Sequence, residues 1–154
     1  MKRTSATICL FTLCAAVLFG CVPGAGSAQE PPEKTAGSPI VVGFSQVGAE
    51  SEWRVANSES MKSALSEENG FELIFDDARN EQENQIRAIR TFIQQDVDYI
   101  VFSPRVETGW TSILQEARDA EIPVIVIDRD IQVEDRSLYT AYSGSDFRRE
   151  GETA

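Results

Sequence analysis

The fold of this chain is decided by residues 71–129, which read FELIFDDARNEQENQIRAIRTFIQQDVDYIVFSPRVETGWTSILQEARDAEIPVIVIDR. Short apolar runs at 71–75, 99–102 and 122–128 alternate with longer segments whose apolar residues show helical spacing. Such runs are typical of buried strands. Strands that alternate with helices predict a parallel sheet covered on both faces. We therefore expect a doubly wound α/β fold.

The same alternation continues on both sides of this stretch. The expected strands are residues 40–45, 71–75, 99–102, 122–128 and 138–142. The first expected helix runs from Glu52 to Glu68 and stops before Gly70, since glycine takes the left-handed cap position at little cost. The second expected helix opens at Asn80, where Glu83 completes a capping-box pattern.

Residue spacing separates the expected core from the solvent-facing positions. The expected buried stripes are Val55, Met61 and Leu65 in the first helix and Ile86, Ile89, Ile93 and Val97 in the second. Trp110 fits the stripe of a third helix and is predicted to pack in the core. The polar run 81–85 is interpreted as a solvated helix start. Asp76 and Asp77 are interpreted as turn residues, with ligand or metal contacts as the alternatives.

The start of the chain predicts export. A charged beginning and the apolar segment 8–19, which is too short to span a bilayer, match a signal peptide. The quartet Leu-Phe-Gly-Cys resembles a bacterial lipobox, so that residues 1–21 would form the signal and Cys21 would carry a lipid. A secretory signal cleaved after Ala28 is the alternative. Residues 22–39, rich in Gly, Pro, Ala and Ser, predict a flexible tether or a merely disordered terminus.

Composition excludes several classes of function. The chain has no histidine, which excludes Ser-His-Asp hydrolysis and histidine-based zinc sites. Cys9 and Cys14 fall inside the predicted signal, so thiol catalysis and disulfides are not expected either. The net charge of −11 argues against nucleic acid or anionic lipid as a partner. No glycine-rich nucleotide motif follows a strand, so no cofactor or metal is expected.

Polar side chains follow two of the expected strands, at the edge where doubly wound sheets bind ligands. Asp128 and Arg129 come directly after a buried strand and pair an acceptor with a rigid donor fork, which suits a polyhydroxylated ligand. The alternative is a solvated surface salt bridge to Asp130 or Arg136. Ser103 ends the neighbouring strand and either offers a hydroxyl to the same crevice or simply terminates that strand.

The loop after the first strand supplies a second set of candidates. Glu50, Trp53 and Arg54 lie at the predicted start of the first helix. An indole face can pack against the C–H face of a sugar while the charged groups bond its hydroxyls. The alternative is an exposed helix start with Trp53 packed as a hydrophobic staple, and the pattern leaves both open. Together these residues predict a binding protein for small polar molecules.

Five motifs together resemble the sugar-binding periplasmic proteins of ribose type. They are Val42-Gly-Phe-Ser-Gln-Val-Gly48, Ser51-Glu-Trp-Arg54, Gln82-Glu-Asn-Gln-Ile86, Ala120-Glu-Ile-Pro-Val124 and Asp128-Arg129. The resemblance implies that residues 40–154 form the N-terminal lobe of a two-lobed protein that closes on one sugar. The implied sugar contacts are Gln46, Glu50, Trp53, Arg54, Ser103, Asp128, Arg129 and, before the last helix, Asp146.

The resemblance also implies a function. The chain would be the solute-binding component of a bacterial ABC sugar importer, a monomer in the periplasm or cell envelope, and not an enzyme. It would carry a galactofuranose-like or galactose-like monosaccharide to a membrane permease. A lobe that signals to a membrane receptor or kinase is the alternative, and an exported sugar-active α/β enzyme is a further one.

Family members are about twice as long as this chain, so the resemblance implies an incomplete lobe, from a truncated gene or an incomplete contig rather than an evolved single-lobe protein. The second lobe, the hinge strands and the returning piece of the first lobe have no counterpart in the sequence. A single lobe cannot close over a sugar and exclude water, whereas closed sites bury most of the ligand. We therefore expect the affinity of the isolated lobe to be greatly reduced.

Overall fold

The computed structural model describes residues 37–145 and 147–153. The predicted signal peptide with Cys21, most of the predicted tether and the candidate Asp146 lie outside the described residues, so these predictions stay predictions. Among the described residues, none of the helices has the length and apolar character needed to span a membrane.

A parallel five-stranded sheet forms the centre of the fold, with the strand order β2-β1-β3-β4-β5. The strands are β1 (Ile40–Gln46), β2 (Phe71–Asp77), β3 (Tyr99–Phe102), β4 (Val124–Asp128) and β5 (Ala141–Gly144). The first strand, β1, lies inside the sheet. β2 pairs with one side of β1, and β3, β4 and β5 follow in order on its other side. This arrangement confirms the predicted doubly wound α/β fold.

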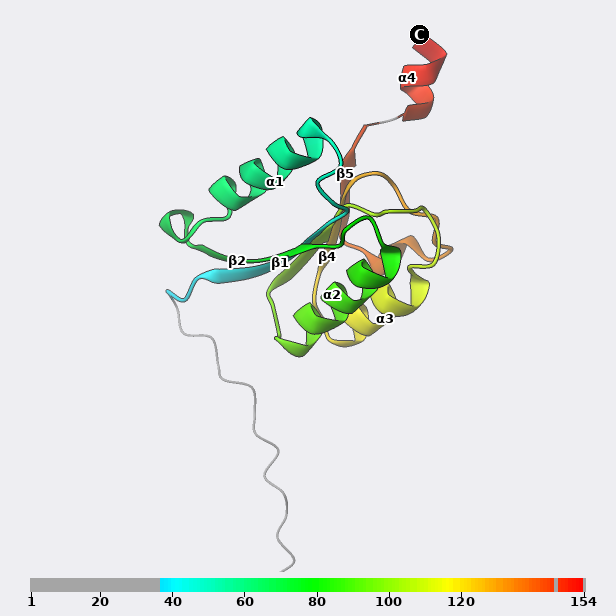
Figure 1. Ribbon diagram of the computed structural model, residues 1–154. Helices are drawn as coiled ribbons and strands as arrows, with labels where there is room; N and C mark the ends of the chain where they lie inside the picture. Colours follow the sequence, from blue (N-terminus) through cyan, green and yellow to red (C-terminus); the bar gives the residue numbers. More distant parts are fainter. Residues whose placement is uncertain (1–36, 146, 154) are drawn as a thin grey trace, which may run out of the picture. The chain divides into compact units, whose positions relative to one another are not determined.

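Helices cover both faces of this sheet. The covering helices are α1 (Glu52–Ala64), α2 (Gln82–Gln94) and α3 (Thr111–Asp119), and a short helix, α4 (Phe147–Thr153), follows β5. Figure 1 shows α1 on one face of the sheet and α2 with α3 on the other. Because the strands are parallel, β1, β3 and β4 all end at the same edge of the sheet.

The larger apolar core lies between the sheet and the α2–α3 pair. Ile89, Phe92 and Trp110 are almost completely buried there, together with residues from β3, β4 and α3. The core position of Trp110 is confirmed, and so is the burial of Ile89 and Val97, although Val97 lies beyond the end of α2. The other two predicted residues, Ile86 and Ile93, are half-buried against this core. Gly43 in β1 lacks a side chain where α2 approaches, because a Cβ at this position would overlap the Phe92 ring. Glycine is therefore required for this close contact.

The face under α1 is packed differently. Met61 and Leu65 contact a small cluster around Val42 and Phe44, as the predicted stripe requires. Val55 is 47% exposed, so its predicted burial is wrong. The buried residues of α1 itself are Arg54 and Ser58, both polar. Polar contacts therefore hold the first half of this helix, and apolar contacts hold its end.

Two predicted helix boundaries differ from the structure. α1 ends at Ala64 and not at Glu68, because residues Glu67–Asn69 form a separate 3-10 turn that Gly70 closes with a φ of 83°. The predicted capping box is wrong, because α2 begins at Gln82 after Glu81 and has no side-chain cap. Asn80 instead takes a φ of 63°, and its N–H donates to the Val47 carbonyl at 2.7 Å.

Four of the predicted strands also have different bounds. β1 ends at Gln46 and not at residue 45, and β4 begins at Val124 and not at residue 122.

The other two are β2 and β5. β2 continues through Asp76 and Asp77, which were predicted to form a turn. The turn follows directly, because Asp77 accepts a hydrogen bond from the Arg79 N–H at 2.8 Å. β5 begins at Ala141 instead of residue 138, because Arg136–Leu138 form a 3-10 turn.

Candidate functional site

Four elements bring the predicted site residues to one edge of the sheet. Gln46 is the last residue of β1 and Asp128 is the last residue of β4. Ser103 follows β3, which lies between those two strands. The loop after β1 leads into the first turn of α1, which carries Arg54 over the same edge. The parallel register therefore gathers side chains that are far apart in the sequence.

The Arg54 guanidinium connects these residues. It is only 4% exposed, and its Nη2 lies 2.9 Å from Asp128 Oδ2. Nη1 donates to Ser103 Oγ at 2.7 Å and to Gln46 Oε1 at 3.3 Å. Nε donates to Glu50 Oε1, also at 3.3 Å. A buried cation needs partners of this kind, because loss of its hydration is costly. Arg54 is therefore the centre of a polar network that the sequence patterns indicated only in parts.

Asp128 sits in an unusual backbone conformation. Its φ is 66°, which a residue with a Cβ adopts infrequently. The Arg129 N–H donates to the Ile127 carbonyl at 2.9 Å, so the chain makes a three-residue γ-turn centred on Asp128. The Tyr142 hydroxyl donates to the Asp128 carbonyl at 3.0 Å and holds this turn. Backbone strain of this kind is concentrated at functional sites, which supports a binding role for the turn.

The Asp128 side chain is fixed by the network. Oδ2 accepts a hydrogen bond from the Ser103 hydroxyl at 3.1 Å, in addition to its ion pair with Arg54. Arg129 Nε lies 3.9 Å from the same oxygen. No hydrogen bond or ion pair within residues 37–145 and 147–153 engages Asp128 Oδ1. The carboxylate is therefore held in one orientation with one oxygen available as an acceptor.

Gln46 lies below the guanidinium and is almost completely buried. Its Nε2 donates to Asn57 Oδ1 at 2.8 Å and to Ser58 Oγ at 3.2 Å. Its Oε1 accepts from the Val47 N–H at 3.0 Å and from Arg54. Gln46 was predicted as a ligand contact, and the structure places its amide in contacts between β1 and α1. Asn57 and Ser58 were not identified from the sequence, because they belong to the polar run 57–60 of the first helix, which gives no sign of burial.

Three of the predicted contact residues are accessible to a ligand. Trp53 is 54% exposed and its ring lies 5.2 Å from the Arg54 guanidinium carbon, which is a cation–π contact. The alternative of a packed staple is therefore wrong. The side chains of Glu50 and Arg129 are also nearly half exposed. The surface salt bridge that was the alternative for Asp128 and Arg129 is formed instead between Asp130 and Arg136, at 3.2 Å.

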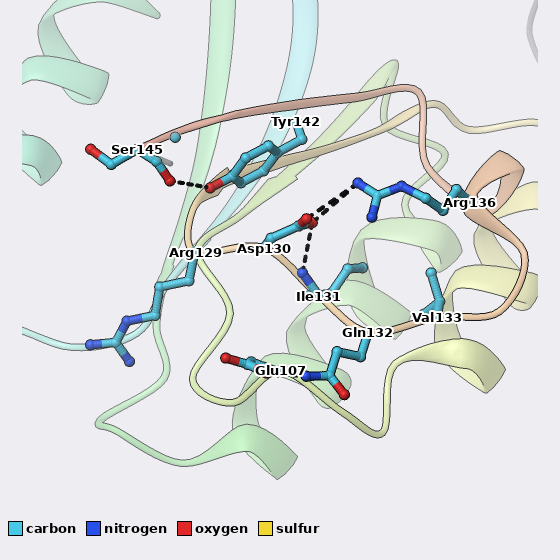
Figure 2. Close-up of a pocket in the computed structure, with 10 residues that line it drawn as sticks. Glu107, Arg129, Asp130, Ile131, Gln132, Val133, Arg136, Tyr142 and Ser145 are labelled. Carbon is cyan, nitrogen blue, oxygen red and sulfur yellow. Dashed lines mark hydrogen bonds and ion pairs between the residues drawn. The ribbon is translucent and has the colours of Figure 1, made fainter. Parts of the chain in front are cut away.

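A hollow of about 1010 Å³ lies beside the network. It is lined by Glu107, Arg129, Asp130, Ile131, Gln132, Val133, Arg136, Tyr142, Gly144 and Ser145. Figure 2 shows the Asp130–Arg136 pair on its wall, with Tyr142 bonded to Ser145, and the Arg129 guanidinium directed away from that pair. Arg129 belongs both to the hollow and to the surroundings of Asp128. It therefore connects the open hollow with the buried network.

The prediction that Gln85 belongs to a solvated helix start is wrong. Gln85 is 0% exposed, and its amide bonds the backbone on both sides of Pro104. One signal could have identified it, because Gln85 precedes the predicted core residue Ile89 by one helical turn and so shares its face. A polar residue in register with a buried stripe is unusual and indicates a specific partner.

Asp76 lies near the end of β2, at the opposite edge of the sheet from β5, and the pKa of its carboxyl is shifted. It is half buried at the end of β2, beside Ser45 in the register of β1. Burial raises the pKa of the Asp76 carboxyl, and the neighbouring Asp77 charge raises it further. Arg79 opposes this shift. Asp76 has no contact with the network around Arg54 among the interactions described above.

The chain matches one protein family model and individual proteins whose ligands are named. Residues 42–154 match the family model described as periplasmic binding protein domain. Over 114 residues the chain is 49% identical to the galactofuranose-binding protein YtfQ of Escherichia coli (strain K12), which covers 74% of this chain and 36% of that protein.

Solved structures agree with this match. The periplasmic binding protein component of the arabinose ABC transporter from Shewanella sp. ANA-3, bound to α- and β-L-arabinofuranose, is 51% identical with a TM-score of 0.69 over 72% of this chain and 36% of that one. A Mycobacterium smegmatis protein in complex with β-D-fucofuranose is 55% identical with a TM-score of 0.70, over 74% and 37% of the two chains. The fructose-binding periplasmic domain of a hybrid two-component system is 29% identical with a TM-score of 0.63, over 74% and 37%. The chain thus spans little more than a third of the length of each relative.

Proposed function

The chain belongs to the periplasmic binding protein domain family, and from this premise we propose that residues 40–154 supply one half of a sugar-binding site. The whole protein is then the solute-binding component of a bacterial ABC sugar importer. Three of the matched relatives are named for furanose sugars: galactofuranose, arabinofuranose and fucofuranose. We therefore propose a monosaccharide ligand, with furanose sugars as the first candidates.

The buried network around Arg54 carries this proposal. It fixes acceptors and donors at the sheet edge before any ligand arrives, so little side-chain entropy is lost on binding. The two arginines of the site, Arg54 and Arg129, lie beside two acidic residues, Glu50 and Asp128. Each charge thus has an opposite charge nearby, and a phosphorylated sugar would have to displace a carboxylate. The arrangement suits a neutral, polyhydroxylated molecule.

The individual roles follow from exposure and chemistry. Asp128 Oδ1 and Glu50 accept hydroxyl protons from the sugar. Arg129 donates to ring and hydroxyl oxygens, because planar guanidinium groups hold their donors in fixed directions. Arg54 is buried and holds Asp128 and Glu50 in position for the sugar. Trp53 forms one wall, since an exposed indole can cover the C–H face of a sugar.

Delivery to a membrane permease, export, and anchoring through Cys21 belong to the same proposal. They are supported by the transporter named for one matched structure and by the signal-like start of the sequence. A second function, sensing, is favoured by the match to the periplasmic domain of a two-component system. Permease genes beside this gene would support import, and a histidine kinase gene would support sensing. Three of the four relatives described above are named as binding proteins or a binding domain, which favours binding over catalysis.

Calorimetric titration tests the proposal. The protein encoded by the complete reading frame is titrated with L-arabinose, D-galactose, D-fucose and D-fructose, and with the 6-phosphates of galactose and fructose. We expect saturable binding of at least one neutral sugar and no binding of the phosphates. Binding should also change the emission of Trp53, which is exposed, whereas Trp110 is buried in the core. A protein that binds none of the sugars, or that prefers a phosphate, would contradict the proposal.

A further inference from the structure

We infer that Gln85 is a positioning residue for the sugar site, although it touches none of the exposed contact residues. Its side-chain amide fixes residues 103–105, and this segment in turn holds both arginines of the site. The inference rests on the proposed function for its sugar-affinity readout, and on the ligand-free geometry alone for its NMR readout.

The contacts of Gln85 are complete and short. It projects from the first turn of α2 and is 0% exposed. Its Nε2 donates to the Ser103 carbonyl at 2.6 Å, and its Oε1 accepts from the Arg105 N–H at 2.9 Å. One amide group thus binds the chain immediately before and immediately after Pro104.

The fixed segment reaches the site at two points. The Ser103 hydroxyl accepts from Arg54 at 2.7 Å and donates to Asp128 at 3.1 Å. The Arg105 carbonyl accepts from Arg129 Nη1 at 3.4 Å. A shift of residues 103–105 would therefore move a partner of Arg54 and a partner of Arg129 at the same time.

The chemistry of the segment explains why an amide is needed. β3 ends at Phe102, and Pro104 has no N–H with which to extend the ladder. The Ser103 carbonyl needs a donor and the Arg105 N–H needs an acceptor. A glutamine amide offers both on one planar group, whereas an ionised carboxylate offers acceptors only. Loss of either function leaves a buried backbone group without its partner.

Two substitutions and a matched control test the inference. Gln85→Met keeps the length of the side chain and removes both hydrogen bonds. Gln85→Glu keeps the shape and the acceptor, and loses the donor at neutral pH. Gln82→Met is the control, because Gln82 lies in the same turn of α2 and donates to a loop carbonyl, Thr108, at 2.7 Å. Those contacts are separate from the network around Arg54.

The first readout is the Arg54 Nε–H resonance in a proton–nitrogen NMR spectrum of this chain without sugar. We expect both Gln85 variants to shift or broaden this resonance, and Gln82→Met to leave it in place. An unchanged Arg54 resonance in a folded Gln85→Met variant would overturn the inference. If that variant does not fold, the sugar affinity of Gln85→Glu at neutral and at acidic pH, described next, decides the question.

The second readout is sugar affinity in the protein from the complete reading frame. We expect Gln85→Glu to weaken binding about tenfold or more at neutral pH, as for an unpaired buried group. As the pH falls the introduced carboxyl takes up a proton and regains its donor, so the ratio of variant to wild-type affinity should rise toward one. Using the ratio cancels the pH effects on the site that both proteins share.

The two failures are distinguishable. Wild-type protein that binds no sugar counts against the proposed function, and the Arg54 resonance then decides on Gln85 alone. Wild-type protein that binds sugar, together with an unchanged affinity of Gln85→Glu at neutral pH, overturns the positioning role. A weakened affinity that does not recover on acidification also overturns it, because the lost donor is then not the cause.

Discussion

The two faces of the sheet differ in the kind of side chain that the covering helices bury. Under α2 and α3 the contacts are mainly apolar, with Ile89, Phe92 and Trp110 almost completely buried and Gln85 as a buried polar exception. Under α1 the buried residues of the helix are Arg54 and Ser58, which belong to the polar network. Apolar burial is the dominant source of folding stability, whereas fixed polar groups recognise ligands. The difference indicates that one face mainly stabilises the lobe and the other mainly forms the site.

The largest effect on stability is expected on the α2 face. Phe92→Ala removes a buried ring that packs against Gly43 and should lower the free energy of unfolding by about 3–5 kcal/mol. Val55→Ala, on the exposed side of α1, should change it by less than about 0.5 kcal/mol. Urea unfolding of this chain measures both. A Phe92→Ala cost as small as that of Val55→Ala would remove the distinction between the faces.

The next prediction concerns the hub of the α1 face. Arg54→Met removes the ion pair with Asp128 and leaves that carboxylate uncompensated, so we expect a loss of about 2–3 kcal/mol of stability and of detectable sugar binding. Adding Asp128→Asn should restore part of the stability and none of the binding, because the uncompensated charge is gone but the donors and acceptors are not replaced. Unfolding and calorimetric titration separate the two effects. Retained sugar binding in Arg54→Met would refute the assignment.

A third substitution separates binding from stability altogether. Arg129 is 47% exposed, so Arg129→Ala should abolish sugar binding and change the free energy of unfolding by less than about 0.5 kcal/mol. Arg90 is the control, because its side chain is 45% exposed and pairs with Glu116 between α2 and α3. Arg90→Ala should leave sugar affinity unchanged. Equal affinities of the Arg129→Ala variant and the wild type, measured by titration calorimetry, would show that Arg129 is not a contact.

Periodicity predicted the α2 face well and the α1 face poorly. Ile89 belongs to an apolar stripe in the second helix and Trp110 to another in the third, and apolar burial follows directly from such helical spacing. Val55 fits a stripe in the sequence but lies in solvent, because polar contacts of Arg54 and Ser58 set the orientation of α1. Hydrogen-bond networks of this kind join residues far apart in the chain, so the spacing of neighbouring residues in the sequence does not predict them.

The site was predictable in composition but not in arrangement. Asp128 and Arg54 could be selected because they follow strands at the edge where parallel sheets bind ligands. Their direct ion pair could not, since it depends on the γ-turn at Asp128 and on the path of the loop before α1. Gln85 was missed for a similar reason. Its partners are backbone groups beside Pro104, and a backbone partner leaves no complementary residue type in the sequence.

The smallest predicted effect concerns the Asp76 carboxyl at the end of β2. Burial and the Asp77 charge raise the pKa of Asp76 in the folded chain, so folding favours the protonated form. The resulting stability is fully present below the unfolded pKa and is lost as the pH rises through the folded pKa. Asp76→Asn removes this loss, so the variant should melt above the wild type at neutral pH, with the difference narrowing on acidification. Thermal melts of the variant and the wild type, from neutral to acidic pH, measure the difference in melting temperature. A difference in melting temperature that stays constant with pH would mean that the Asp76 carboxyl has the same pKa in the folded and the unfolded chain, and would contradict the prediction.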